Sequence, residues 1–144
     1  MAQKTAVAEL ADQIAQYNLV YRNMHKSLTK VGKIPLAQYY VLLILSRHDQ
    51  LRMGDISQIM AISRPNLTPL IDKLTEKKLV NRLPDAKDRR VTYNSITKAG
   101  TDLLQKENDA ICQNIEKKLG HLTDDDLRTI SNSLSAIMQI AEKV

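Results

Sequence analysis

The sequence predicts a mainly α-helical chain with a small β-wing. A winged helix-turn-helix should lie in the middle, flanked by long N- and C-terminal helices. Three observations predict this class. Apolar residues recur at helical spacing over most of the 144 residues, only four Gly and four Pro interrupt them, and one short segment before residue 97 alternates like a strand. We take the chain as one unit with a helical region at residues 1–34 and 101–144 and a winged region at residues 35–100.

The composition is that of an ordinary soluble domain, with 43% apolar and 26% charged residues. The chain lacks Phe and Trp, so the core must consist of aliphatic residues, Met and some of the five Tyr. We expect no membrane contact, because no apolar run reaches the length of about 18 residues that suggests a spanning helix. The N-terminus leads into no apolar signal core, and the single Cys112 allows no internal disulfide. A reducing compartment, the cytoplasm, is therefore expected.

Two long helices are predicted from seams in which apolar residues alternate at spacings of three and four. The first seam consists of Val7, Leu10, Ile14, Tyr17, Tyr21, Met24, Leu28 and Val31, and the second of Leu127, Ile130, Leu134, Ile137, Ala141 and Val144. Gly32 and Pro35 should end the first helix, while Thr123 should begin the last one. Such seams need other helices to pack against, either within the monomer or in a second copy of the chain.

The middle of the chain predicts a central apolar helix at residues 36–47, a possible short strand at residues 51–53, and then two short helices joined by a tight turn at residues 56–74. Asp55 should cap the first of these two helices and Ser63 the second, since both are favoured N-cap residues. The second helix buries an apolar stripe and exposes polar residues: Arg64, Asn66, Thr68 and Lys73. A helix of this kind fits the major groove of DNA, although an ordinary helical hairpin in a core would show the same pattern.

A β-hairpin should follow, with strands at residues 79–83 and 91–96 and a polar turn carrying adjacent arginines. Thr97 should cap a helix running from Lys98 to about Leu119. The inner face of this helix carries apolar residues, with Asn108 interrupting them: Leu104, Ile111, Ile115 and Leu119.

Positive charge is concentrated in the winged region. Residues 64–100 hold nine Lys or Arg against four Asp or Glu, whereas residues 101–144 hold five against eight. The net charge of +5 therefore comes mainly from the middle of the chain. This distribution favours an anionic partner there, although chance clustering on a solvated face remains an alternative.

The wing and its flanks carry a family resemblance. Asp88-Arg89-Arg90, followed by Ile96-Thr97-Lys98-Ala99-Gly100, resembles the wing signature of the MarR family of bacterial transcriptional regulators. Residues 66–68 and 72–74, with 79–82, are similar to the recognition helix of that family and its exit. Two residues depart from the pattern. Asn94 stands where the family usually has an aliphatic residue, and Pro69 inside the second short helix should bend or loosen it.

The resemblance implies a homodimeric regulator, a repressor, that binds double-stranded DNA at a near-palindromic operator. Ser63, Thr68 and Lys73 would contact phosphates, while Arg64 and Asn66 have the groups that read guanine and adenine. Arg90, or else Arg89, would enter the minor groove from the wing. The full set of expected DNA contacts is Ser63, Arg64, Pro65, Asn66, Thr68, Lys73, Lys87, Arg89 and Arg90.

The same resemblance implies dimerisation through the first and last helices. The expected dimerisation residues are Val7, Leu10, Ile14, Leu127, Ile130, Leu134, Ile137 and Val144. It also implies release from DNA by a small lipophilic or phenolic ligand bound between the helical and winged regions. The candidate pocket residues are Arg22, His25, Tyr39 and Tyr40, although each of them also fits a structural role.

Other functions are less favoured by the residues. The chain has no Gly-rich phosphate loop and no clustered set of catalytic groups, so we expect no enzyme, no catalytic residue and no cofactor. Its His residues are far apart in sequence, so no metal site is expected. Cys112 should be a small buried apolar residue, although a redox-responsive regulator remains an alternative. A winged-helix module that binds proteins instead of DNA is the other alternative.

Overall fold

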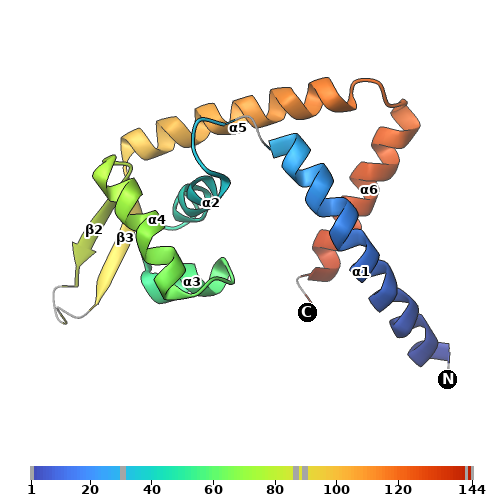
Figure 1. Cartoon of the computed structure of the whole chain (residues 1–144), viewed down its shortest axis with the longest axis horizontal. Coiled ribbons are helices and arrows are strands. Elements are labelled where there is room, and N and C mark those ends of the chain that lie inside the picture. Colours follow the sequence, from blue (N-terminus) through green and yellow to red (C-terminus); the bar gives the residue numbers. More distant parts are fainter. Residues whose placement is uncertain (1, 30–31, 86–87, 89–90, 142, 144) are drawn as a thin grey trace.

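The computed structural model describes every residue except 1, 30–31, 86–87, 89–90, 142 and 144, and it leaves undescribed the side chains of residues 2–5, 18–20 and 24. The predicted class, mainly α with a small β-wing, is confirmed (Figure 1). The helices are α1 (Ala2–Thr29), α2 (Leu36–Leu45), α3 (Met53–Ile59), α4 (Arg64–Glu76), α5 (Lys98–Leu119) and α6 (Asp124–Ala141). The strands are β1 (Leu51–Arg52), β2 (Val80–Pro84) and β3 (Thr92–Ile96). Within the described residues, no helix combines the length and the apolar character that crossing a membrane requires.

The winged region consists of α2, α3, α4 and a three-stranded antiparallel sheet in the order β1-β3-β2. Its core is aliphatic, as the lack of Phe and Trp requires. The side chains in it that are fully buried include Val41, Leu42, Leu45, Ile56, Leu67, Ile71 and Leu74. Because α4 contributes three of these residues, its orientation is fixed by the core, and its opposite face is left for solvent.

The two short helices form the predicted helix-turn-helix, but their caps differ from the prediction. α3 begins at Met53, so Asp55 lies in its first turn and accepts a hydrogen bond from the Arg52 backbone N–H at 3.1 Å. The prediction that Asp55 is the N-cap was therefore wrong. Ser63 does occupy the N-cap position of α4, but its hydroxyl makes no capping hydrogen bond. The turn between the helices instead depends on Ala61, which adopts a left-handed φ of 51°.

α4 is continuous through Pro69, so this residue does not interrupt the helix. Its lost N–H hydrogen bond lies on an exposed part of the helix, where water can hydrogen-bond the freed carbonyl group. Burial of Leu67, Ile71 and Leu74 on the other side holds the helix against the core. The packing of α4 therefore outweighs the local preference of Pro69.

α5 begins and ends where the sequence predicted, with the Thr97 hydroxyl accepting a hydrogen bond from the Gly100 N–H at 3.0 Å. The polar interruption of its inner face was placed wrongly. Glu107 is buried at 4% exposure, whereas Asn108 is exposed. One position separates them, but on a helix that step turns a side chain by about 100° and so moves it off the inner face.

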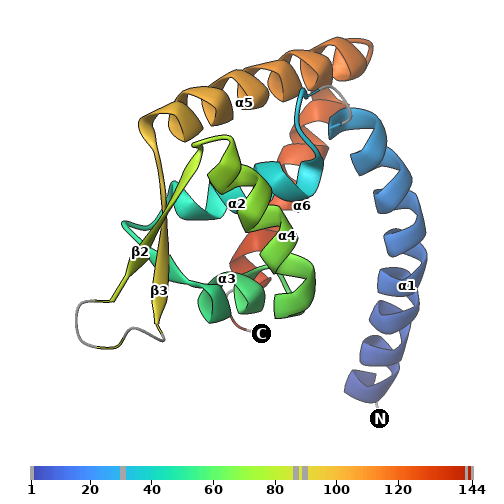
Figure 2. The same cartoon turned by 60° about the vertical axis from the view of Figure 1, so that its left-hand side comes forward.

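α5 joins the two ends of the molecule. In Figure 1 the winged region lies below one end of α5, and α1 and α6 lie towards its other end. Figure 2, turned by 60°, shows α1 standing apart from the winged region along most of its length. At the start of α6, Thr123 and Asp126 are joined by hydrogen bonds. The hydrogen bonds that Thr123 donates lower the pKa of the Asp126 carboxyl. None of the residues of α6 is buried within the chain.

Candidate nucleic-acid interface

The N-terminal half of α4 presents a polar surface. Arg64, Asn66 and Thr68 are all exposed, as are Ser63, Pro65 and Lys73. The intervening Leu67 is fully buried, so these polar side chains lie on the outward side of the helix. Five of the nine residues expected to contact DNA are thereby exposed at the N-terminal end of α4, and a sixth, Lys73, is exposed in its last turn.

Arg64 lies close to the preceding helix. A methyl group placed on Gly54 of α3 would come within 2.7 Å of the Arg64 Nη2 atom. The small residue at Gly54 thus leaves room for the guanidinium group across the first turn of α3. Thr68 donates its hydroxyl hydrogen to the Arg64 carbonyl oxygen at 2.9 Å, but its oxygen remains exposed as a potential acceptor.

The wing is tied to α4 by an ion pair. Arg82 on β2 donates through Nη2 to the Asp72 carboxylate on α4, and both side chains are partly exposed. The turn beyond β2 is held by backbone hydrogen bonds, including Asp85 N–H to the Val91 carbonyl at 2.9 Å. The predicted wing contacts Lys87, Arg89 and Arg90 lie outside the described residues.

Arg52 is a further cation beside the β2–β3 hairpin that the sequence prediction missed. Its Nε and Nη2 atoms donate to the Tyr93 hydroxyl at 3.2 and 2.9 Å, and the guanidinium carbon lies 5.3 Å from the centre of that ring. The hydrogen bond to Tyr93 is the main cause that raises the pKa of Arg52 above its ordinary value. Arg52 pairs with Tyr93 across β1 and β3, a register that a two-residue strand cannot indicate in sequence.

The predicted dimerisation residues form exposed apolar faces on α1 and α6. On α1 the exposed fractions of Val7, Leu10 and Ile14 are 61, 54 and 52%, and on α6 those of Leu134 and Ile137 are 51 and 56%. Leu127 and Ile130 are also exposed, while Val144 lies outside the described residues. The two faces meet in an apolar groove of about 720 Å³ lined by Leu10, Gln13, Ile14, Tyr17, Ala136, Ile137, Ile140 and Ala141.

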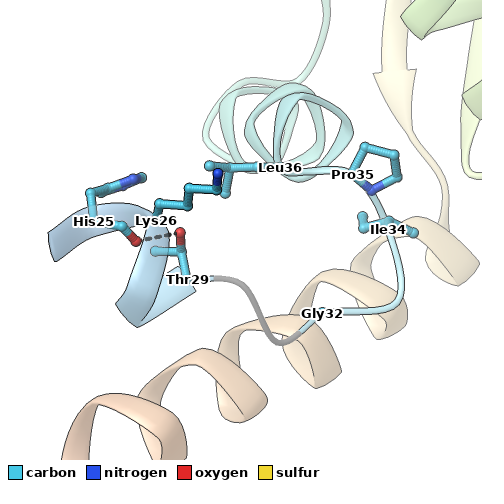
Figure 3. Close-up of a pocket in the computed structure, with 7 residues that line it drawn as sticks. All are labelled: His25, Lys26, Thr29, Gly32, Ile34, Pro35 and Leu36. Atoms are coloured by element: carbon cyan, nitrogen blue, oxygen red, sulfur yellow. Dashed lines mark hydrogen bonds between the residues drawn. The ribbon is translucent and has the colours of Figure 1, made fainter. Parts of the chain in front are cut away.

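A second cavity lies between the end of α1 and the beginning of α2. It has a volume of about 540 Å³ and is lined by His25, Lys26, Thr29, Gly32, Ile34, Pro35 and Leu36 (Figure 3). The polar groups come from α1, whereas the linker and α2 provide apolar walls. A cavity of this size is within the range that holds small organic ligands.

The four predicted pocket residues do not all gather at this cavity. His25 lines it, and Tyr40 reaches His25 from α2, with the Tyr40 hydroxyl 2.8 Å from His25 Nε2. Tyr39 is buried and donates to Asn108 Oδ1 on α5 at 3.3 Å. Arg22 is exposed on α1 and is not among the lining residues. Burial is the main cause that raises the pKa of both Tyr39 and Tyr40.

The remaining candidates for chemistry are Cys112 and possible metal ligands. Cys112 is exposed on α5, so the prediction that it is buried was wrong. It follows the buried Ile111 and lies close enough to Tyr39 to contribute, after burial, to the raised pKa of that phenol. Within the described parts of the chain, no three His, Cys, Asp or Glu residues are grouped as metal ligands would be.

A family model matches the segment of the chain that carries this geometry. The family model described as "MarR family" matches residues 34–92, the segment that contains α2, the helix-turn-helix and the start of β3. Over this segment, which is less than half of the 144 residues, the chain is similar to the MarR family. The matched residues include the exposed end of α4 and the turn of the wing.

Individual proteins show the same similarity. The HTH-type transcriptional repressor MdtR of Bacillus subtilis is 27% identical over 128 residues, which is 89% of this chain and 82% of MdtR. The structure of wild-type apo MarR from E. coli superposes with a TM-score of 0.76 at 20% identity, covering 85% of this chain and 94% of that one. A mutant of the same MarR, in complex with operator DNA, superposes with a TM-score of 0.68 at 20% identity over 90% of this chain and 95% of that one. The curated relative is a transcriptional repressor, and the two solved MarR structures share the fold of this chain.

Proposed function

We propose that this protein is a homodimeric repressor that binds a near-palindromic DNA operator and is released from it by a small ligand. The observation that carries the proposal is the exposed polar end of α4 on a helix whose other side is fully buried. A short helix held in this way can enter the major groove without losing its packing. The E. coli MarR structure with operator DNA supports the same use of the fold.

The contacts divide into those that supply affinity and those that supply specificity. Ser63, Thr68 and Lys73 would bind phosphate oxygens, and Pro65 would start α4 close to the DNA backbone. Arg64 and Asn66 would read base edges, because a guanidinium group can donate two hydrogen bonds to guanine and an amide can pair with adenine. Lys87, Arg89 and Arg90 would extend the contact along the wing, with Arg90 entering the minor groove.

A second copy of the chain would cover the apolar faces of α1 and α6. The apolar residues on these faces are shielded from water only if another helix packs on them. α6 buries none of its own residues within the chain. The resulting two-fold dimer would present two copies of α4 to successive major grooves. Its half-sites should therefore lie one DNA turn, about 10 base pairs, apart.

The ligand would bind in the cavity between α1, the linker and α2. His25, Lys26 and Thr29 offer polar groups, while Ile34, Pro35 and Leu36 offer apolar contacts, a combination that suits a small lipophilic or phenolic compound. The cavity lies where the helical region joins the winged region, so a ligand there can favour one relative arrangement of the two. The protein is released from DNA if, in that arrangement, the distance between the two recognition helices no longer matches the distance between successive major grooves. The protein would act where the bacterial chromosome lies, in the cytoplasm.

Selection of bound fragments from the genome of the source organism tests the proposal. The full-length protein should enrich fragments that share a near-palindrome, and the affinity for the shared site should fall steeply with salt as phosphate contacts displace counterions. Sedimentation of the protein should give the mass of a dimer. If no fragment is enriched and no salt-dependent binding occurs, the proposal is wrong, and the winged region is better explained as a protein-binding module.

A further inference from the structure

Glu107 is a carboxylate in the middle of an apolar stripe. Leu104 and Ile111, three positions before it and four after it on α5, are buried against the winged region. Glu107 is itself only 4% exposed. A buried carboxylate loses its hydration, so it is stable only where protein groups donate hydrogen bonds to it.

The donor comes from the linker between α1 and α2. The backbone N–H of Lys33 donates to both oxygens of Glu107, at 2.9 Å to Oε1 and 2.8 Å to Oε2. The neighbouring Gly32 packs so closely that a methyl group placed on it would overlap Glu107 Oε2. Gly32 therefore allows the linker to approach the carboxylate, and the charge-assisted hydrogen bond holds it there.

The end of α1 is held by the same face of α5. The Asn114 Nδ2 atom donates to the Ser27 and Leu28 carbonyl oxygens at 3.2 and 2.6 Å, and Lys118 Nζ donates to the Ser27 hydroxyl at 2.6 Å. Asn114 and Lys118 follow Glu107 by seven and eleven positions, which places all three on one side of the helix. These contacts fix α1 to α5, but they lie beyond the linker, on the side of the helical region.

The contact between Glu107 and Lys33 lies where the helical region joins the winged region. Two connections join the helical region to the winged region: α5 itself and the linker that leads from α1 into α2 (Figure 1). A single helix connecting two bodies can bend or rotate at its ends. The contact between Glu107 and Lys33 fastens the linker to the part of α5 that packs on the winged region, and so limits how the helical region can move relative to the winged region.

We propose that Glu107 is a positioning residue that sets the separation of the two recognition helices and thereby the half-site spacing that the dimer accepts. This inference rests on the proposed function, since spacing has a meaning only for a dimer that binds two half-sites. Glu107 touches no DNA. It acts through the linker, because a winged region free to rotate can follow half-sites displaced by one base pair, about 3.4 Å along the duplex.

The experiment compares spacing selectivity between variants. Duplexes carry the half-sites enriched by the wild-type protein, either at the enriched separation or at a separation one base pair longer or shorter. The readout is the affinity for the enriched separation divided by the affinity for a changed separation. In Glu107→Leu this ratio should fall by about three- to tenfold, because the hydrogen bond to the linker is lost while the apolar stripe is completed. Glu107→Gln, which retains one acceptor oxygen, should fall between Glu107→Leu and the wild type. Gly32→Ala should match Glu107→Leu, since the added methyl group displaces the same carboxylate.

Glu116→Gln is the matched control, because it removes a carboxylate from an exposed position of the same helix. Its ratio should equal that of the wild type. Thermal melting of each variant separates positioning from folding. A purely structural role would lower the melting temperature and leave the ratio unchanged, and that result would overturn the inference.

The double variant Gly32→Ala/Glu107→Leu adds a second test. Its ratio should equal that of Glu107→Leu alone, because both changes break one contact. Additive losses would contradict the assignment. If Glu107→Leu does not form dimers, Glu107→Gln and Gly32→Ala decide in the same way. If the wild-type protein binds none of the duplexes, the proposed function itself has failed, which differs from binding with unchanged selectivity.

Discussion

Asn94→Leu should make the protein more stable, although it replaces a hydrogen-bonded residue. Asn94 lies in the middle of β3, between Leu51 on β1 and Arg82 on β2, and is fully buried. Its Nδ2 atom donates to the Leu51 carbonyl oxygen at 3.3 Å, a long hydrogen bond. Its Oδ1 atom finds no donor among the described residues. Leu has the same branched shape as Asn, with methyl groups in place of the two polar atoms.

The magnitude follows from the two polar atoms. Removing a buried acceptor without a partner gains about 1–3 kcal/mol, and losing the long hydrogen bond costs about 0.5–1.5 kcal/mol. The larger methyl groups cost up to about 1 kcal/mol more through tighter packing. Taking the middle of each range, the net free energy of unfolding should therefore rise by up to about 1 kcal/mol. For a chain of this length, that corresponds to an increase in melting temperature of up to about 4 °C.

Urea unfolding at a fixed protein concentration measures the change, since a dimer is more stable at higher concentration. Ser95→Val is the control, because Ser95 is the next residue of β3, points to the opposite face and is only partly buried. It reports how much the exchange of a polar residue for an apolar one in this strand changes stability by itself. If Asn94→Leu lowers the midpoint by more than Ser95→Val changes it, the Asn94 amide is fully satisfied in solution, and our assignment of an unpaired oxygen is refuted.

Three further variants probe DNA binding and folding. Arg64→Ala should cost about 1–3 kcal/mol of binding and relax preference at one base position; an equal loss on all sequences in a binding-site selection would make Arg64 a phosphate contact. Arg90→Ala should reduce the salt slope by about one and weaken binding to A·T-rich flanks, and an anisotropy titration with the wild-type slope would argue against a wing contact. Gly100→Ala should lower the free energy of unfolding by about 1–3 kcal/mol, because the added methyl group would overlap the Leu79 carbonyl oxygen. Ala99→Gly, on the exposed side of the same turn, serves as its control in urea unfolding.

Local sequence patterns were sufficient where one element carries its own signals. The bounds of α5 follow from Thr97 before it and Gly120 after it, and the hairpin follows from two alternating segments around a polar turn. The short strand β1 was also indicated in the sequence, at residues 51–53. These features depend on neighbours within a few positions, so a single sequence contains the relevant information.

Features that depend on distant partners were not predicted. The Glu107 contact joins residues 74 positions apart, and the Arg52 contact with Tyr93 joins residues 41 apart. Ser63 was placed correctly at the N-cap of α4, but its type did not show that its hydroxyl makes no capping hydrogen bond. Position in the fold, rather than residue type, decides such cases.

One signal for Glu107 was nevertheless present in the sequence. It occupies the position between Leu104 and Ile111 that the helical repeat assigns to an apolar residue. An acidic residue at such a position needs either an exposed helix face or a donor from elsewhere in the chain, and burial of its neighbours excludes the first. The nearest unsatisfied donors in a helical protein lie in its linkers, where backbone N–H groups have no helical partner. A polar residue that breaks a buried seam therefore points to the loop that packs on it, and in this chain that loop joins the helical region to the winged region.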